Sequence, residues 1–343
     1  MTNKVLNIKI RDDIFRFIRP ILIMLMLCGY DYNIYNNIYA KIAVKSYCVI
    51  LVSLVTYSGV FCCPIEISQY WSVSEYVCSV IVIFFSKSQT SIFCSKLKDI
   101  DAYLRINYRH YYTNRLKLII FCIITWLVRI AYTFLYCSKE PCYNDIILYA
   151  IRMYCLFALD LNRVWRCIVF DIIRFRLRTL RIRLEENPEL NYYLYVKNCK
   201  SIKENKIRFC LNIYICIADL VDLISPELHA LVTIFFFQEP LEILGYIALH
   251  ATQMCMLLFS PFVVVEFYSV EVEKMRLFLV HQLIDKNGSD LKEDIEMFLR
   301  YIEIRTFKYR IFRTIPISLV VPLELINLCV TYVIVLINYN HLY

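Results

Sequence analysis

Polar side chains recur along one face of an otherwise aliphatic segment close to the C-terminus. At about 100° of rotation per residue, Glu324, Asn327, Thr331, Val335 and Asn338 fall within an arc of roughly 80° on a helix. Polar groups are costly in hydrocarbon, so this face has to meet protein or water. Two interpretations stay open, because the stripe could form hydrogen bonds between helices or line a water-filled path. One helix cannot enclose such a path, so the second interpretation requires several copies of the chain.

Polar and aromatic side chains also occur in the predicted outer halves of three other apolar segments. Intramembrane cations are expensive enough to indicate function, and apolar walls with a few aimed polar groups suit a small amphiphilic ligand. Three alternatives stay open: the arginines could reach the headgroups, the tyrosines could form an interfacial belt, and the histidine could be a core residue. The predicted ligand-binding residues are Arg129, Tyr132, Tyr149, Arg152, Tyr246, His250 and Gln253.

Motifs for catalysis and metal binding are missing from the sequence. With four glycines the chain cannot build a phosphate-binding loop or a dinucleotide fingerprint, and it contains neither HExxH nor GxSxG. The sixteen cysteines include no CxxC pair, and most lie inside apolar runs, where cysteine acts as a small buried hydrophobe. We therefore expect no catalytic residues, no metal and no cofactor.

The elements that carry these residues are predicted to be membrane-spanning helices. The chain has 343 residues, of which 59% are hydrophobic, and several apolar runs reach the roughly 20 residues that a helix needs to cross a bilayer. These runs lack the strict alternation of strands. We predict an all-α membrane protein with a single domain over 1–343 and spans at about 42–62, 71–93, 116–136, 144–168, 212–237, 246–268 and 317–338.

The distribution of Lys and Arg predicts the orientation of these spans. Basic residues are frequent in 1–45, 94–117, 171–210 and 270–313, whereas 63–70, 238–245 and the C-terminal tail have none and 137–143 has Lys139 alone. Because basic loops stay in the cytoplasm, the N-terminus is predicted inside and the C-terminus outside. The formal net charge of +8 then belongs to the cytoplasmic face and needs no nucleic acid. The sequon Asn287–Gly288–Ser289 is predicted to stay unglycosylated.

Amphipathic patterns predict that helices continue beyond the spans into the cytoplasm. They cover LRTLRIRLEE (177–186), VEVEKMRLFLVHQLI (270–284) and DLKEDIEMFLRYIEIRTFKYRIF (290–312). The fifth span contains Asp219 and Asp222, so its first half is open to the same interpretation. The apolar run PILIMLMLCG near the N-terminus is followed by no cleavage site, and we interpret it as a retained cytoplasmic or interfacial helix.

The end of the chain resembles a known family. Thr331–Tyr332, five aliphatic residues and Asn338–Tyr339 resemble the signature TYhhhhhQF of insect gustatory receptors, in which h is hydrophobic. The surrounding RTIPISLVVPLELINLCVTYVIVLINYNHLY is similar to moth and butterfly members. The predicted spans and sidedness match too, so the resemblance covers the whole chain, although related odorant receptors share those features. Asn338 and Tyr339 replace Gln and Phe, which keeps an amide and an aromatic ring, and asparagine is one methylene shorter than glutamine.

This resemblance implies a function and an assembly. It implies a homo- or heterotetramer that acts as a ligand-gated, non-selective cation channel in the plasma membrane of chemosensory neurons. The last helix would line the pore, with Asn338 near the outer mouth and Thr331 deeper, and the aliphatic residues between them could form a hydrophobic gate. Bitter or plant secondary compounds would be the ligands.

Three alternatives are weighed against this interpretation. An odorant receptor belongs to the same class of protein. A G-protein-coupled receptor would have the opposite sidedness, and the sequence lacks both Asp-Arg-Tyr and Asn-Pro-x-x-Tyr. A secondary transporter would place its site between repeats whose helices are broken by Gly or Pro, and no repeat is visible.

Overall fold

A computed structural model of the chain gives the fold in the parts that can be described. These are residues 18–32, 37–61, 67–85, 90–104, 106, 146–185, 192–193, 203–204, 206–236, 247–285, 289–305, 310–311 and 315–316, with single positions between 120 and 131 and between 324 and 335. Within some of these helices only the backbone is described, notably at 58–61, 67–72, 146–149, 151–152, 224–236 and 247–262.

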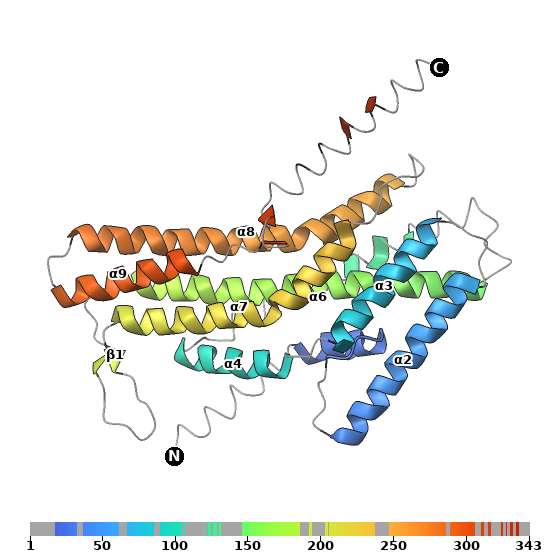
Figure 1. Cartoon of the computed structure of the whole chain (residues 1–343), viewed down its shortest axis with the longest axis horizontal. Helices are drawn as coiled ribbons and strands as arrows, with labels where there is room; N and C mark the ends of the chain where they lie inside the picture. Colours follow the sequence, from blue (N-terminus) through green and yellow to red (C-terminus); the bar gives the residue numbers. More distant parts are fainter. Residues whose placement is uncertain are drawn as a thin grey trace.

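The described residues are helical except for two short antiparallel strand pairs (Figure 1). A short helix, Ile18–Leu27, comes first. The strand pairs are β1 (Tyr192–Tyr193) with β2 (Lys203–Glu204), and β3 (Arg310–Ile311) with β4 (Ile315–Pro316). The all-α prediction therefore agrees with the architecture. The helices are α2 (Ile38–Phe61), α3 (Ile67–Phe85), α4 (Thr90–Tyr103), α6 (Ile146–Glu185), α7 (Lys206–Phe236), α8 (Ile247–Asp285) and α9 (Ser289–Ile304).

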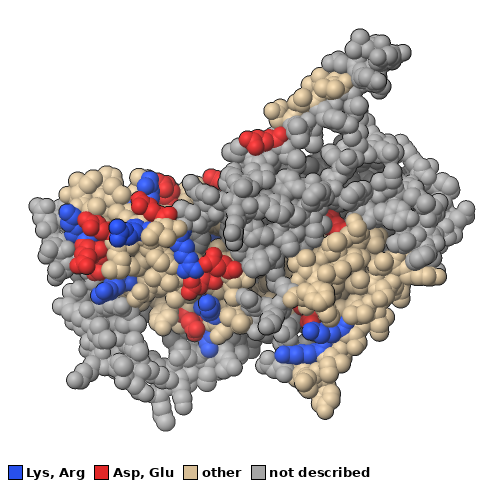
Figure 2. Space-filling model, in the orientation of Figure 1, with Lys and Arg blue, Asp and Glu red and all other residues tan. Residues whose placement is uncertain are grey.

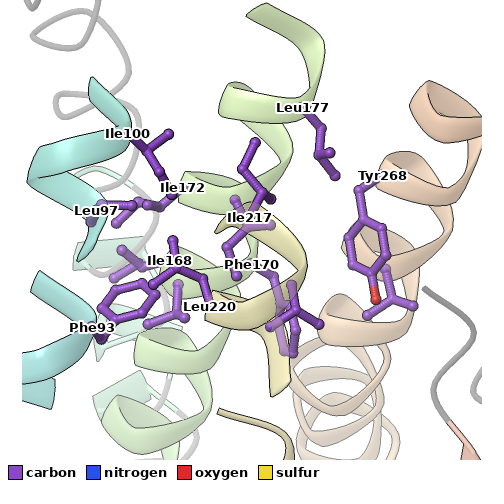
Figure 3. Packing of buried hydrophobic residues seen from close by; sticks show 14 of the residues in the cluster. Phe93, Leu97, Ile100, Ile168, Phe170, Ile172, Leu177, Ile217, Leu220 and Tyr268 are labelled. Carbon is purple, nitrogen blue, oxygen red and sulfur yellow. The ribbon is translucent and has the colours of Figure 1, made fainter. Parts of the chain in front are cut away.

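Helix α6 is the centre of the packing. It contacts α2, α3, α7 and α8, while α9 packs on α7 and α8, and α4 packs on α7. Figure 3 shows the resulting core, in which Leu97 of α4, Ile172 of α6 and Ile217 of α7 meet. All three side chains are almost completely buried.

The long helices continue past the predicted spans, as the amphipathic patterns indicated. Helix α6 has 40 residues and is therefore about 60 Å long, roughly twice the hydrocarbon thickness of a bilayer. It includes 177–185, and α8 includes 270–284. In the third pattern, 290–312, the described residues are helical up to Ile304, whereas Arg310–Ile311 form a strand that pairs with Ile315–Pro316. Aromatic and β-branched residues, which favour strands, are frequent after Ile304, and Pro316 cannot continue a helix.

The predicted span 71–93 covers parts of two described helices, α3 and α4. Helix α3 ends at Phe85 and α4 begins at Thr90. The residues between them, 86–89, lie outside the described part of the chain. Their sequence, SKSQ, is polar, and serine favours helix ends and turns over helix interiors.

The helix Ile18–Leu27 buries one face in the bundle and leaves another exposed, where Ile23, Met24 and Leu27 are 36–54% exposed. Ile18, Leu22 and Leu25 are almost completely buried. Gly29 ends this helix with a φ of +85°, and the backbone N–H groups of Gly29 and Tyr30 donate to the carbonyls of Met26 and Leu25 at 2.9 and 3.0 Å. This is the Schellman arrangement, in which glycine takes the left-handed position after a helix.

Charged and apolar surfaces are separated along the molecule. In Figure 2 most acidic and basic side chains of the visible face lie over the end that carries α9, and smaller charged groups lie elsewhere. The exposed residues of α2 are instead mostly apolar, including Ile42, Ile50 and Leu54 at 56–63% exposure. Within the described residues, Ile38–Tyr57 is long and apolar enough to cross a membrane, and Ile18–Leu27 and Val73–Phe85 are shorter apolar helices.

Candidate functional site

The predicted polar stripe lies on an exposed helical face wherever it is described. Glu324, Asn327, Thr331 and Val335 are helical and exposed, and the Thr331 hydroxyl donates to the Asn327 carbonyl oxygen at 2.8 Å. Asn338, together with Tyr332 and Tyr339 of the motif, lies outside the described residues. A hydroxyl that bonds its own helix is less costly in an apolar environment, yet it can exchange that bond for water.

This face mixes polar and aliphatic side chains. Val330, Ile334 and Val335 are 50–57% exposed beside Asn327 and Thr331. The aliphatic residues alone could face lipid, whereas a carboxylate and an amide on the same side could not do so without a large cost. Since these residues stay exposed in the single chain, the face is available for water or for another copy of the chain.

The predicted ligand-binding residues are only partly placed. Tyr149 and Arg152 lie in the first two turns of α6, and His250 and Gln253 lie in the first two turns of α8. Helices α6 and α8 pack against each other and begin at the same end of the molecule (Figure 1). The side chains of these four residues, and all of Arg129, Tyr132 and Tyr246, lie outside the described part.

A buried polar cluster between α3 and α6 was missed from the sequence. The Arg163 guanidinium binds Glu75 at 2.6 Å and Asp160 at 3.5 Å. The Tyr32 hydroxyl donates to the Asn162 side-chain oxygen at 3.0 Å. Because each of these side chains is at most 9% exposed, the ion pairs fix how α3, α6 and residues 30–32 pack. Glu75 is an acidic residue inside an apolar run, a signal that could have indicated such a partner.

Several polar atoms of this cluster lack a hydrogen-bond partner among the described residues. They are Glu75 Oε2, Ser79 Oγ, Asn162 Nδ2, Arg166 Nε and the Tyr30 hydroxyl. Buried polar atoms are normally paired with protein or with internal water. The cluster offers both donors and acceptors, so it can hold hydrogen-bonded water inside the bundle.

Two further ion pairs join the extended parts of the helices. Arg176 of α6 binds Asp101 of α4 at 2.7 Å, and both side chains are fully buried. Arg181 of α6 binds Glu271 of α8 at 2.6 Å. Within the described residues, no group of three or more His, Cys, Asp or Glu side chains could hold a metal ion.

Comparison with known proteins gives a fold and no family. No protein-family model matches the chain, and no curated protein matches it. Among solved structures, it is similar to the insect olfactory receptor OR5 from Machilis hrabei in complex with eugenol, with a TM-score of 0.55 and 14% sequence identity. The match covers 96% of this chain and 99% of that receptor. Over nearly its whole length, the chain has the fold of an insect olfactory receptor.

Proposed function

We propose that the protein is an insect chemoreceptor of the gustatory type that acts as a ligand-gated, non-selective cation channel in the plasma membrane of chemosensory neurons. The observation that carries this proposal is the full-length fold similarity to an olfactory receptor. The exposed apolar surface of α2 fits a bilayer environment. The fold fits taste and odorant receptors equally, and the motif that starts at Thr331–Tyr332 favours taste.

The pore in this proposal is formed by the C-terminal helix. Glu324, Asn327, Thr331 and Val335 share an exposed face, and in a homo- or heterotetramer such faces from several subunits would surround one axis. Thr331 and Asn338 would supply hydrogen-bonding groups to hydrated cations. Val335, together with its neighbours, would form the hydrophobic constriction that gates by dewetting.

The ligand in this proposal is a small molecule. The olfactory receptor of similar fold was solved with eugenol, an amphiphilic molecule of the kind that an apolar pocket with a few polar groups accommodates. The starts of α6 and α8, which carry Tyr149, Arg152, His250 and Gln253, are the part of this chain where we place the pocket. Bitter or plant secondary compounds are the proposed ligand class.

The experiment that tests the proposal combines particle symmetry with membrane current. We expect the purified chain in lipid nanodiscs to form fourfold particles with the 317–338 helix around the axis. Whole-cell recordings with a panel of plant bitter compounds should detect a cation current. A monomer without an axial pathway would contradict the channel and favour a transporter.

Substitutions in the stripe test the assignment of the pore. Val335→Ala combined with Asn338→Leu should change conductance and ion selectivity at equal surface expression, because both side chains would line the narrow path. Leu54→Ala on the exposed face of α2 is the matched control and should leave both quantities unchanged. An unchanged conductance and selectivity in the double variant would remove the C-terminal helix from the pore.

A further inference from the structure

Arg305 joins α9 to α7 through three side-chain partners. Its Nη1 atom donates to Asp219 Oδ1 at 2.7 Å and to the Tyr301 hydroxyl at 2.6 Å. Its Nη2 atom donates to Asp222 Oδ2. Asp219 and Asp222 lie three positions apart on α7 and therefore share one face of that helix. The fork geometry of the guanidinium allows one side chain to reach both carboxylates.

This contact stands where the chain leaves the helical bundle. Helix α9 ends at Ile304, and the backbone N–H of Arg305 still donates to the Tyr301 carbonyl at 2.9 Å. The next described element is β3, which begins at Arg310, pairs with β4 and contacts α7. The exposed helical stripe that starts at Glu324 follows β4. Among the side chains that the structure describes, Arg305 is the last one before the stripe, and it is bonded to α7.

The packing of α7 on α9 does not depend on Arg305. Tyr214 of α7 makes edge contacts with the rings of Phe298 and Tyr301, with centroids 5.5 and 6.0 Å apart. Tyr214 and Phe298 are completely buried. This apolar contact holds the two helices together one to two turns before Arg305. The ion pairs therefore add a constraint at the exit from α9 and not in the middle of the interface.

The contact is partly open to water. The Arg305 side chain is 32% exposed, and its two carboxylate partners are 40% and 62% exposed. Hydrogen bonds to Tyr301 and to both aspartates raise the pKa of Arg305, so the guanidinium remains charged at any physiological pH. Solvated ion pairs are individually weak and exchange partners readily. The solvated ion pairs of Arg305 can thus break and re-form while the aromatic contact of Tyr214 with Phe298 and Tyr301 stays intact.

We propose that Arg305 is a positioning residue that transmits movement of α7 to the C-terminal helix. When Arg305 is paired with Asp219 and Asp222, the start of the segment after α9 is held against α7. When α7 moves, these two ion pairs break and the C-terminal helix becomes free to rotate. The link to conduction rests on the proposed function, whereas the mechanical coupling between α7 and the C-terminal helix does not.

Hydrogen–deuterium exchange of the full chain in nanodiscs tests the coupling without a ligand. Arg305→Gln should accelerate exchange in residues 310–335 by about tenfold while 206–218 and 289–300 keep their protection, because only the contact at the exit is lost. Arg276→Gln is the matched control, since that guanidinium binds Glu273 on its own helix. Unchanged exchange in 310–335 would overturn the inference. Faster exchange throughout α7 and α9 would also overturn it, because Arg305 would then stabilise both helices as a whole.

A variant with swapped charges and recordings of membrane current test the inference separately from the proposed function. R305D combined with D219R should restore the wild-type rate of hydrogen exchange in 310–335. A variant that had lost its fold could not show this recovery. If the chain conducts, R305Q should change the basal current without ligand by several-fold at equal surface expression, and the restored pair should return it. Faster exchange in R305Q without current from the wild-type chain would support the coupling and count against the channel. A basal current that R305Q leaves unchanged would overturn the link to gating alone.

Discussion

At the scale of single residues, three tyrosines complete the end of the helix Ile18–Leu27. Tyr47 of α2 and Tyr154 of α6 both donate to the Leu27 carbonyl, at 2.8 and 2.7 Å. Tyr76 of α3 donates to the Cys28 carbonyl at 2.9 Å. These are carbonyls that a helix end leaves without a partner. One helix terminus is therefore tied to three other helices, and this explains how a short segment can hold a fixed place in the bundle.

The three hydroxyls predict unequal effects of removing one oxygen. Tyr76→Phe should lower the free energy of unfolding by about 1–3 kcal/mol, because the buried Cys28 carbonyl loses the hydroxyl donor. Tyr47→Phe should cost less, since Tyr154 still donates to the same Leu27 carbonyl. Thermal unfolding of the purified protein, followed by loss of the monodisperse peak in detergent, measures the order. Equal losses for the two variants would contradict it.

Sequence reasoning at this scale succeeded for local patterns and failed for distant partners. The stripe from Glu324 to Val335 follows from helical spacing, and its described residues are helical, while its role in a pore stays a prediction. Glu75 and Arg163 are 88 positions apart, and Asp101 and Arg176 are 75 apart. Many basic residues could have met either carboxylate. Only the packing of α3 and α4 on the rest of the bundle selects the partner, and no periodic pattern records it.

At the scale of elements, periodicity predicted helices better than it predicted their ends. The extension of α6 to Glu185 and of α8 to Asp285 follows from amphipathic spacing that continues beyond the apolar run. The strand pair Arg310–Ile311 with Ile315–Pro316 was missed, because apolar content alone does not show where a helix stops. The packing partners of the N-terminal helix could not be predicted, since they are single tyrosines on α2, α3 and α6.

The buried pair between α4 and α6 gives a prediction about these two elements. Arg176→Met should lower stability by about 3–5 kcal/mol, because it leaves the Asp101 carboxylate buried without its partner. Arg176→Met with Asp101→Leu should recover most of that loss, because no buried charge remains. Arg276→Met, at an exposed pair within α8, is the control and should change stability little. Thermal unfolding of the wild type and the three variants measures these differences in stability. A double variant as unstable as Arg176→Met would show that the unpaired Asp101 charge does not cause the loss.

At the scale of the whole molecule, α6 connects the two regions that the surface distinguishes. It packs on α2 and α3, where exposed side chains are apolar, and on α7 and α8 toward the charged end (Figures 1 and 2). A helix of about 60 Å can lie in the bilayer over half its length and in water over the rest. This arrangement explains why the basic residues of 171–185 follow an apolar run within the same helix.

The orientation of this molecule in the membrane predicts where sugars can be attached. The native sequon Asn287–Gly288–Ser289 lies between α8 and α9, at the charged end, which the positive-inside rule assigns to the cytoplasm. It should carry no glycan. A second sequon, appended after Tyr343 on a Gly/Ser linker of about 20 residues, should be glycosylated because the C-terminus is predicted outside. Gel mobility with and without glycosidase measures both sites in the same cells, and Asn287→Gln in each form identifies the band. A glycan at Asn287 and none on the appended sequon would invert the topology. Asn338 and the starts of α6 and α8, where the ligand is proposed to bind, would then lie on the cytoplasmic side.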